Sequence, residues 1–185
     1  MKLIISFFLF AISISTLGQD KYNYIDFNRL SEVKGTPYVI ASIYNRGKMA
    51  EAKSKYLLFI NTQNGEQTRV EFPSEGKISQ VKQVKMDSLA INCILVLAQT
   101  VDLDLKGGID WSDPKQLFML SPNGKEKVQI SDDDFFISTF TTNEQTGTIV
   151  ITGYYDTNKN GKHDKNDKNS ILIYDLKSKT VVSKV

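Results

Sequence analysis

Short apolar runs alternate with polar turns along most of the chain, and this rhythm predicts strands rather than helices. The runs are a few residues long and rich in Ile, Val, Leu, Phe and Tyr, a composition typical of β-strands. No segment keeps a 3.6-residue apolar period over several turns, so long helices are not expected. The hydrophobic pattern therefore predicts an all-β body.

Three predicted hairpins share one pattern: an apolar strand, a polar turn and a second strand. Their first strands begin at Tyr56, Gln116 and Ser170, and their second strands are expected at residues 68–72, 127–130 and 180–185. The Asn-Gly pairs at residues 64–65 and 123–124 suit tight turns, because both residue types tolerate positive φ. The three copies indicate an internal repeat.

Two more strands are predicted before each hairpin, so each unit has four strands in up-and-down order. The inner ones are expected at residues 38–44, 93–101 and 148–155, and the first ones at residues 22–28, 79–85 and 135–142. The second and third units align without a gap, 54 residues apart. We therefore expect three repeated four-stranded antiparallel units, at about residues 22–73, 79–131 and 134–185, in one all-β domain spanning residues 19–185.

Residues 117–131 resemble the outer hairpin of a Tol-type β-propeller repeat, in which a strand, Ser-Pro-Asp/Asn-Gly and a second strand recur. The other two hairpins are similar to it more loosely. The resemblance implies propeller-like blades, yet that family closes a ring with about six blades and this chain has room for three. We expect an open or half-propeller that a homodimer completes, since exposed strand edges favour association. The alternative is a β-barrel or sandwich.

Residues 1–18 form a separate unit in front of this body. A short basic start is followed by an apolar run over residues 3–15, and Thr16 and Gly18 place small residues before a cut at Gln19. This anatomy is typical of a secretory signal peptide, and the run is short for a bilayer span of roughly 20 residues. An uncleaved anchor is the alternative. We expect a secreted or periplasmic protein with no membrane span after cleavage.

The charge distribution and the single cysteine argue against a nucleic-acid partner and against an internal disulfide. The formal net charge of +2 falls to +1 when Lys2 is removed, and the charges are interspersed, which argues against a nucleic-acid partner. Cys93 is the only cysteine and cannot form an internal disulfide. Its place in an apolar run predicts a buried small hydrophobe.

The clearest chemistry lies in residues 156–167, directly after the strand expected to end at Tyr155. Numbered from one to twelve, this segment has oxygen-bearing side chains at positions one, three, five, nine and twelve, and Gly161 at position six. That spacing is typical of a twelve-residue calcium loop. The candidate calcium ligands are Asp156, Asn158, Asn160, Asp164 and Asp167, with the backbone carbonyl of Lys162 at position seven.

The lysines of this segment support the same interpretation, because none stands at a position that needs a side-chain ligand. The loop resembles those of EF-hands and, with Asp at position twelve, those of dockerin modules. Its flanks predict strands instead of helices, so we expect a lone loop that closes a β-hairpin. His163, at position eight, is expected to be a solvent-exposed filler. The alternative is a polar turn without metal.

A partial copy of the loop lies at residues 102–113. Aspartates stand at positions one, three, nine and twelve, and Gly107 at position six. Lys106 occupies position five, where its ammonium is expected to lie in place of a metal and neutralise the carboxylates. The corresponding segment of the first unit, residues 46–55, has Glu51 as its one acid, so no site is predicted there.

One histidine and one cysteine leave no Ser-His-Asp or Cys-His constellation, and no glycine-rich phosphate-binding string occurs. Residues 132–134, three consecutive aspartates, are expected to form a turn. Trp111, Tyr154 and Tyr155 flank the loops and are expected to pack, although they suit sugar stacking. We expect an exported, calcium-binding, non-enzymatic binding or scaffold domain with a protein or glycan partner. The alternatives are a carbohydrate-binding module and a carboxylate-based hydrolase.

Overall fold

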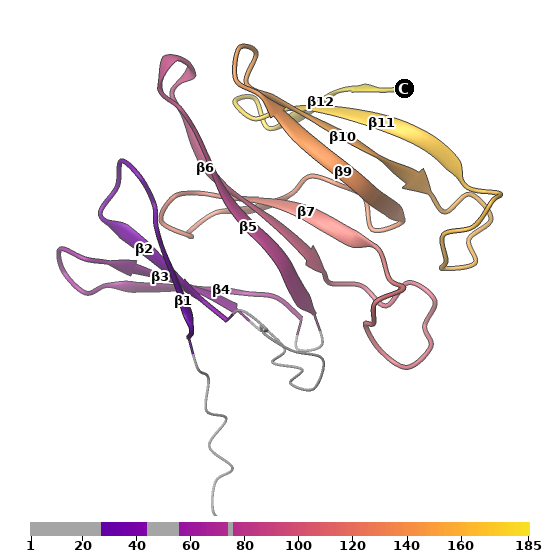
Figure 1. The fold of residues 1–185 in the computed structure, drawn as a ribbon, viewed down its shortest axis with the longest axis horizontal. Helices are drawn as coiled ribbons and strands as arrows, with labels where there is room; N and C mark the ends of the chain where they lie inside the picture. Colours follow the sequence, from indigo (N-terminus) through magenta and orange to yellow (C-terminus); the bar gives the residue numbers. More distant parts are fainter. Residues whose placement is uncertain (1–26, 44–55, 74–75) are drawn as a thin grey trace, which may run out of the picture.

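A computed structural model of the protein describes residues 27–43, 56–73 and 76–185 (Figure 1). Within these ranges the chain forms twelve strands in three four-stranded antiparallel sheets, and the one helical segment is the 3-10 turn η1 (Asp87–Leu89). The all-β prediction with three repeated units is confirmed, and none of the described sheets closes into a barrel. The predicted signal peptide and residues 46–55 lie outside the described residues.

The first sheet runs in chain order. It consists of β1 (Arg29–Glu32), β2 (Tyr38–Ser42), β3 (Tyr56–Asn61) and β4 (Gln67–Glu71). The prediction of a first strand at residues 22–28 is wrong for its described part, because residues 27 and 28 are not in a strand. The turn at Gly35 (φ 77) places Glu32 opposite Val39. Leu30 is the one apolar residue of β1, so no alternating pattern marks this edge strand.

The second sheet lies between the other two and is buried on both faces (Figure 1). Its strands are β5 (Lys77–Met86), β6 (Ile91–Gln99), β7 (Lys115–Leu120) and β8 (Lys127–Gln129). Cys93 and Leu95 pack with the third sheet, whereas Ile94 and Val96 pack with the first. Successive residues of a strand point to opposite faces. A strand covered on both sides therefore needs the unbroken apolar run that β6 has.

The third sheet packs on the second, so the three sheets lie in a row. It consists of β9 (Phe135–Asn143), β10 (Thr148–Tyr155), β11 (Lys168–Asp175) and β12 (Thr180–Lys184). Ile149, Ile151 and Leu172 pack against the second sheet. A β-bulge at Thr152 and Gly153 shifts the register between β9 and β10. The strand ends at Tyr155, as the sequence predicts, and the chain enters the loop 156–167 from there.

Neighbouring sheets are also joined by ion pairs at their hairpin turns. Lys125 in the turn of the second sheet contacts Glu66 of the first at 3.1 Å, and Lys179 in the turn of the third contacts Glu126 of the second at 2.8 Å. The two lysines lie 54 residues apart, the spacing of the repeat. The units therefore share their packing as well as their strand order.

The opposite end of the sheets carries the long connections. The β6–β7 loop contains residues 102–113 and the β10–β11 loop contains residues 156–167, and the two lie next to each other (Figure 1). Among the described residues, no helix is long and apolar enough to cross a membrane.

Candidate metal centre

The loop 156–167 is held by its own side-chain oxygens. The Asp156 carboxylate accepts hydrogen bonds from the backbone N–H groups of Asn160 (3.1 Å) and Gly161 (2.8 Å). The Asp167 carboxylate accepts from those of Thr157 (3.2 Å) and Asp164 (2.7 Å). Asp and Asn side chains readily make such local bonds to nearby amides. Positions one and twelve therefore fix both ends of the loop.

The remaining predicted ligands fill the middle of this loop. The Asn158 and Asn160 side-chain oxygens each accept a backbone N–H two residues further on, at 3.1 Å and 2.8 Å. Their side-chain amides donate to one Asp164 oxygen, at 3.1 Å and 2.7 Å. Positions three, five and nine thus point toward one another. No group of three carboxylates close enough to share an ion occurs in this loop of the described structure.

The loop 102–113 repeats several of these hydrogen bonds. The Lys106 N–H donates to Asp102 and Asp104 at 3.3 Å and 2.9 Å, as the Asn160 N–H does to Asp156 and Asn158. The position-twelve residue again accepts from positions two and nine: Asp113 holds the N–H groups of Leu103 and Asp110, each at 2.8 Å. The backbone is left-handed at positions four and six of both loops. The two loops are therefore one structural motif used twice.

Three aspartates of the loop 102–113 come together in the way a metal ion requires. Asp102, Asp104 and Asp113 each offer a carboxylate oxygen, and these oxygens lie within 4.8 Å of one another. Asp113 is buried and the other two are half-buried. Such a cluster can hold a cation, since hard divalent ions take several carboxylate oxygens. Sequence reasoning ranked this loop second, although its carboxylates are the ones that converge.

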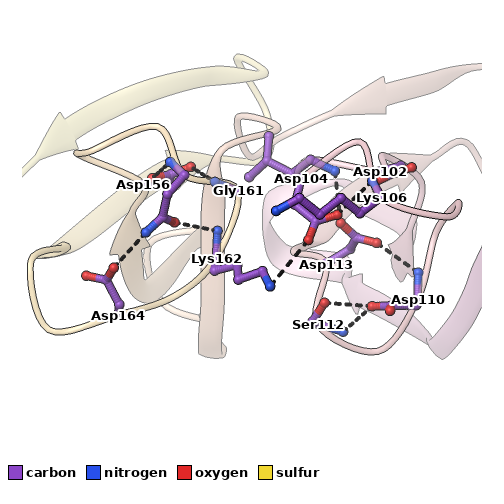
Figure 2. A network of polar contacts seen from close by, with 12 residues as sticks. Asp102, Asp104, Lys106, Asp110, Ser112, Asp113, Asp156, Gly161, Lys162 and Asp164 are labelled. Atoms are coloured by element: carbon purple, nitrogen blue, oxygen red, sulfur yellow. Dashed lines mark hydrogen bonds and ion pairs between the residues drawn. The ribbon is translucent and has the colours of Figure 1, made fainter.

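The lysine that approaches this cluster comes from the neighbouring loop. Lys106 was expected to neutralise the carboxylates, but its side chain is exposed and makes no ion pair with another described residue. Instead the Lys162 ammonium lies 3.6 Å from an Asp104 carboxylate oxygen (Figure 2). The sequence predicts only a backbone carbonyl ligand at Lys162, and its side-chain contact is visible only in the structure. Lys162 therefore connects the two loops.

The loops also touch through their backbones. A Cβ atom added to Gly161 would lie 2.5 Å from the Asp104 α-carbon, closer than real Cβ contacts. Gly161 is needed here both for this approach and for its left-handed backbone (φ 75). Position six of one loop thus rests on position three of the other. The 54-residue repeat could have signalled this contact, because it puts both loops at the same end of adjacent sheets.

Hydrogen bonding lowers the pKa of one carboxylate in each loop, the exposed Asp110 and the half-buried Asp164. The pKa of Asp110 is lowered first by the Ser112 hydroxyl and backbone N–H, both donating at 2.7 Å, and also by the Lys162 charge. The pKa of Asp164 is lowered first by the Asn166 N–H. Hydrogen bonds to the ionised form favour that form. In both loops the hydrogen bonds therefore stabilise the ionised carboxylate.

Of the aromatic residues near the loops, the two tyrosines pack on other rings and the tryptophan is exposed. Tyr155 packs on Phe135, with ring centroids 4.7 Å apart, and donates its hydroxyl to Asp132. The Tyr154 ring lies 4.3 Å from that of His163, so this exposed histidine packs as well, beyond its expected role as filler. Trp111 is 87% exposed, and the expectation that it packs is wrong.

Cys93 and the three aspartates at 132–134 have roles in packing and in the backbone turn. Cys93 is buried with a free thiol, and burial raises its pKa to about 11, which confirms the buried-hydrophobe prediction. The three aspartates at 132–134 form the bend before β9, as predicted, and the Asp134 carbonyl accepts the Asp156 N–H at 3.0 Å. This bond ties the acidic turn to the start of the loop.

No protein-family model matches the sequence, and no curated protein shows significant similarity to it. The resemblances to Tol-type repeats and to EF-hand or dockerin loops stay predictions that rest on this chain's own residues.

Proposed function

We propose that the protein is an exported, calcium-binding, non-enzymatic binding or scaffold domain, and that its two adjacent loops hold the calcium. The observation that carries the proposal is the convergence of Asp102, Asp104 and Asp113, whose carboxylate oxygens lie within 4.8 Å of one another. It is supported by the loop 156–167, which repeats the same backbone hydrogen bonds with the ligand spacing of a calcium loop.

The ligand chemistry favours calcium over other metals. Both loops offer carboxylates and backbone carbonyls, and the loop 156–167 adds side-chain amides. These oxygen ligands suit hard cations, and neither loop offers the thiolates that soft metals prefer. Calcium accepts six to eight oxygens in flexible geometry, whereas magnesium demands a tight octahedron. Irregular loops with several side-chain oxygens therefore suit calcium better.

The two loops should differ in affinity. At its ligand positions the loop 102–113 brings four aspartates, whereas the loop 156–167 brings three aspartates and two neutral amides. More carboxylates attract a dication more strongly, so we expect the loop 102–113 to bind first. The Lys162 ammonium, 3.6 Å from Asp104, competes with the ion and lowers this affinity. We expect a Kd on the order of 10⁻⁴–10⁻³ M, the range of extracellular calcium modules.

A non-enzymatic role is supported by the state of the titratable groups. The only histidine packs on Tyr154, and the Cys93 thiol is buried with a raised pKa. Hydrolysis by two carboxylates needs one of them protonated, with a raised pKa. Every described aspartate or glutamate with a resolved shift has a lowered pKa instead. None of these five carboxylates therefore offers the protonated acid that such hydrolysis needs.

Calcium should raise the melting temperature of the mature protein. With a Kd of about 0.2 mM and free calcium at about 2 mM, ligand linkage supplies roughly 1.4 kcal/mol, which corresponds to an increase of about 3–6 °C. Magnesium should have a smaller effect. The measurement is thermal unfolding with calcium, with magnesium and with EDTA.

Two loop variants and one control variant test whether the calcium-dependent rise in melting temperature comes from the loops. Asp104→Asn introduces the residue type that stands at position three of the other loop. It removes a charge while keeping the side-chain shape, so it should weaken calcium binding severalfold. Asp156→Asn tests the loop 156–167 in the same way. Glu144→Gln changes an exposed acid in the distant β9–β10 turn and should keep the full shift. If calcium does not raise the wild-type melting temperature at millimolar concentration, both loops are polar turns.

A further inference from the structure

The loop 102–113 presents two large apolar side chains to solvent. Leu105, at position four, is 85% exposed, and Trp111, at position ten, is 87% exposed. They are the most exposed large hydrophobic residues of the described chain. Neither belongs to the two core clusters that hold the sheets together. Folding therefore does not explain why these positions are apolar.

The backbone at Leu105 makes its side chain more unusual. Its φ of 56 lies in the left-handed region, which Gly, Asn and Asp adopt at lower cost than Leu. Lys159 stands at position four of the other loop with nearly the same φ, 57. A leucine that is both strained and exposed at an otherwise polar position suggests that its side chain has a partner outside the chain.

The same two positions in the neighbouring loop carry positive charge. Lys159 and Lys165 stand at positions four and ten of the loop 156–167, and both are exposed. Because Gly161 rests on Asp104, the apolar pair of one loop and the cationic pair of the other share one end of the molecule. Lys106 adds a further exposed cation. This end therefore combines two exposed apolar side chains with lysines. Its two loops also hold seven aspartates against four lysines, and six of these aspartates are buried or half-buried. Bound cations are needed to offset the carboxylates and make this end cationic.

An anionic phospholipid surface fits this combination better than a sugar does. Trp is favoured at the interface between headgroups and hydrocarbon, a leucine gains from leaving water, and lysines are attracted to anionic headgroups. A sugar would use the Trp111 ring but would leave Leu105 and the lysines without a role. With cations bound in the loops, the lysines and the two apolar side chains together favour an anionic membrane surface.

We propose that the loop end docks on anionic phospholipid membranes, with Leu105 and Trp111 entering the headgroup region and the lysines contacting lipid phosphates. The calcium dependence of this docking rests on the proposed function, because a bound cation neutralises the loop carboxylates that would otherwise repel the surface.

Trp111 is the only tryptophan of the chain, so its fluorescence reports on this site alone. The mature protein is mixed with vesicles of phosphatidylcholine alone or with added phosphatidylglycerol, each with calcium and with EDTA. We expect Trp111 emission to shift to the blue, and the protein to sediment with the vesicles, only when phosphatidylglycerol is present. Calcium should strengthen both effects.

Matched variants locate the contact. Leu105→Asn places a residue that tolerates the left-handed backbone, so it should keep the fold while weakening vesicle binding on the order of tenfold. Lys159→Gln and Lys165→Gln should each weaken binding about fivefold. Leu30→Gln removes another exposed leucine, 69% exposed on the first sheet, and should leave binding unchanged.

The outcomes separate this proposal from calcium binding. If calcium raises the melting temperature but vesicles neither shift Trp111 emission nor sediment the protein, the membrane proposal is wrong and calcium binding stands. Docking that persists in EDTA and still depends on Leu105 supports the membrane proposal and contradicts a need for calcium. A Trp111 shift caused by soluble glycans and not by vesicles identifies a sugar site and overturns the membrane proposal.

Discussion

At the scale of single residues, Gly161 and Gly107 form a natural comparison. Both stand at position six of their loops with left-handed backbones, φ 75 and φ 96. A Cβ atom at Gly161 would overlap the Asp104 backbone, whereas a Cβ atom at Gly107 would meet nothing within 4 Å. The contact between the loops therefore depends on the first glycine and not on the second.

Gly161→Ala should destabilise the protein more than Gly107→Ala. The Gly107 variant has only the left-handed cost of an alanine, roughly 1–2 kcal/mol. The Gly161 variant adds the overlap with Asp104, for a total of about 3 kcal/mol or more. Urea unfolding of the two variants and wild type measures the difference. Equal losses would contradict the close packing of the loops.

At the scale of elements, the edge strand β12 is held by a contact that crosses the third sheet. The Lys184 ammonium donates to the Asp132 carboxylate at 2.9 Å, and Tyr155 donates to the same oxygen at 2.9 Å. The pKa of Asp132 is lowered, first by Lys184, and that of Lys184 is raised, first by Asp132. Both side chains of the ion pair are about half exposed, 50% for Lys184 and 53% for Asp132, so solvent screens much of their attraction.

Lys184→Met should lower the free energy of unfolding by about 0.5 kcal/mol at neutral pH. An aspartate with a lowered folded pKa stabilises the protein above its unfolded pKa of about 3.9 and loses this contribution as the pH falls through the folded value. The variant and wild type should therefore converge near pH 2.

Urea unfolding at both pH values measures this difference. Lys82→Met, which changes an exposed lysine without an ion pair to another described residue, is the control and should match wild type at both. A difference between Lys184→Met and wild type that persists at low pH would mean that Lys184 acts through packing instead of charge.

At the scale of the whole molecule, the row of three sheets is open at its carboxyl-terminal edge. Val181, Val182 and Val185 are 44%, 60% and 75% exposed on or beside β12. An exposed apolar edge strand favours pairing with another chain. The association of two copies stays a prediction, and this edge is where a variant can test it.

The mature protein should therefore be a homodimer at micromolar concentration. Val182→Lys should shift it to a monomer without loss of strand content, because a lysine on an edge strand opposes edge pairing. Light scattering measures the mass, and circular dichroism checks the fold. A monomeric wild type at this concentration would remove the dimer from consideration.

The sequence by itself determined the local structure of this protein. Strand β10 and the turns at Gly65 and Gly124 follow from residues that are neighbours in the chain, since alternation and turn chemistry act over a few residues. The hydrogen bonds of both loops are equally local, because Asp and Asn side chains bond amides two to ten residues away. Local signals of this kind are visible without a fold.

Only the tertiary structure decided the position of the edge strand β1 and the contacts between neighbouring units. The edge strand β1 has little apolar pattern, so its position follows from pairing with β2. The approach of Lys162 to Asp104 and the contact of Gly161 with the same residue join loops 54 residues apart. These contacts exist because two sheets pack side by side with both loops at one end. Sheet packing therefore determines that Lys162 is the lysine that faces the carboxylate cluster. The spacing of residues within one loop does not encode this contact.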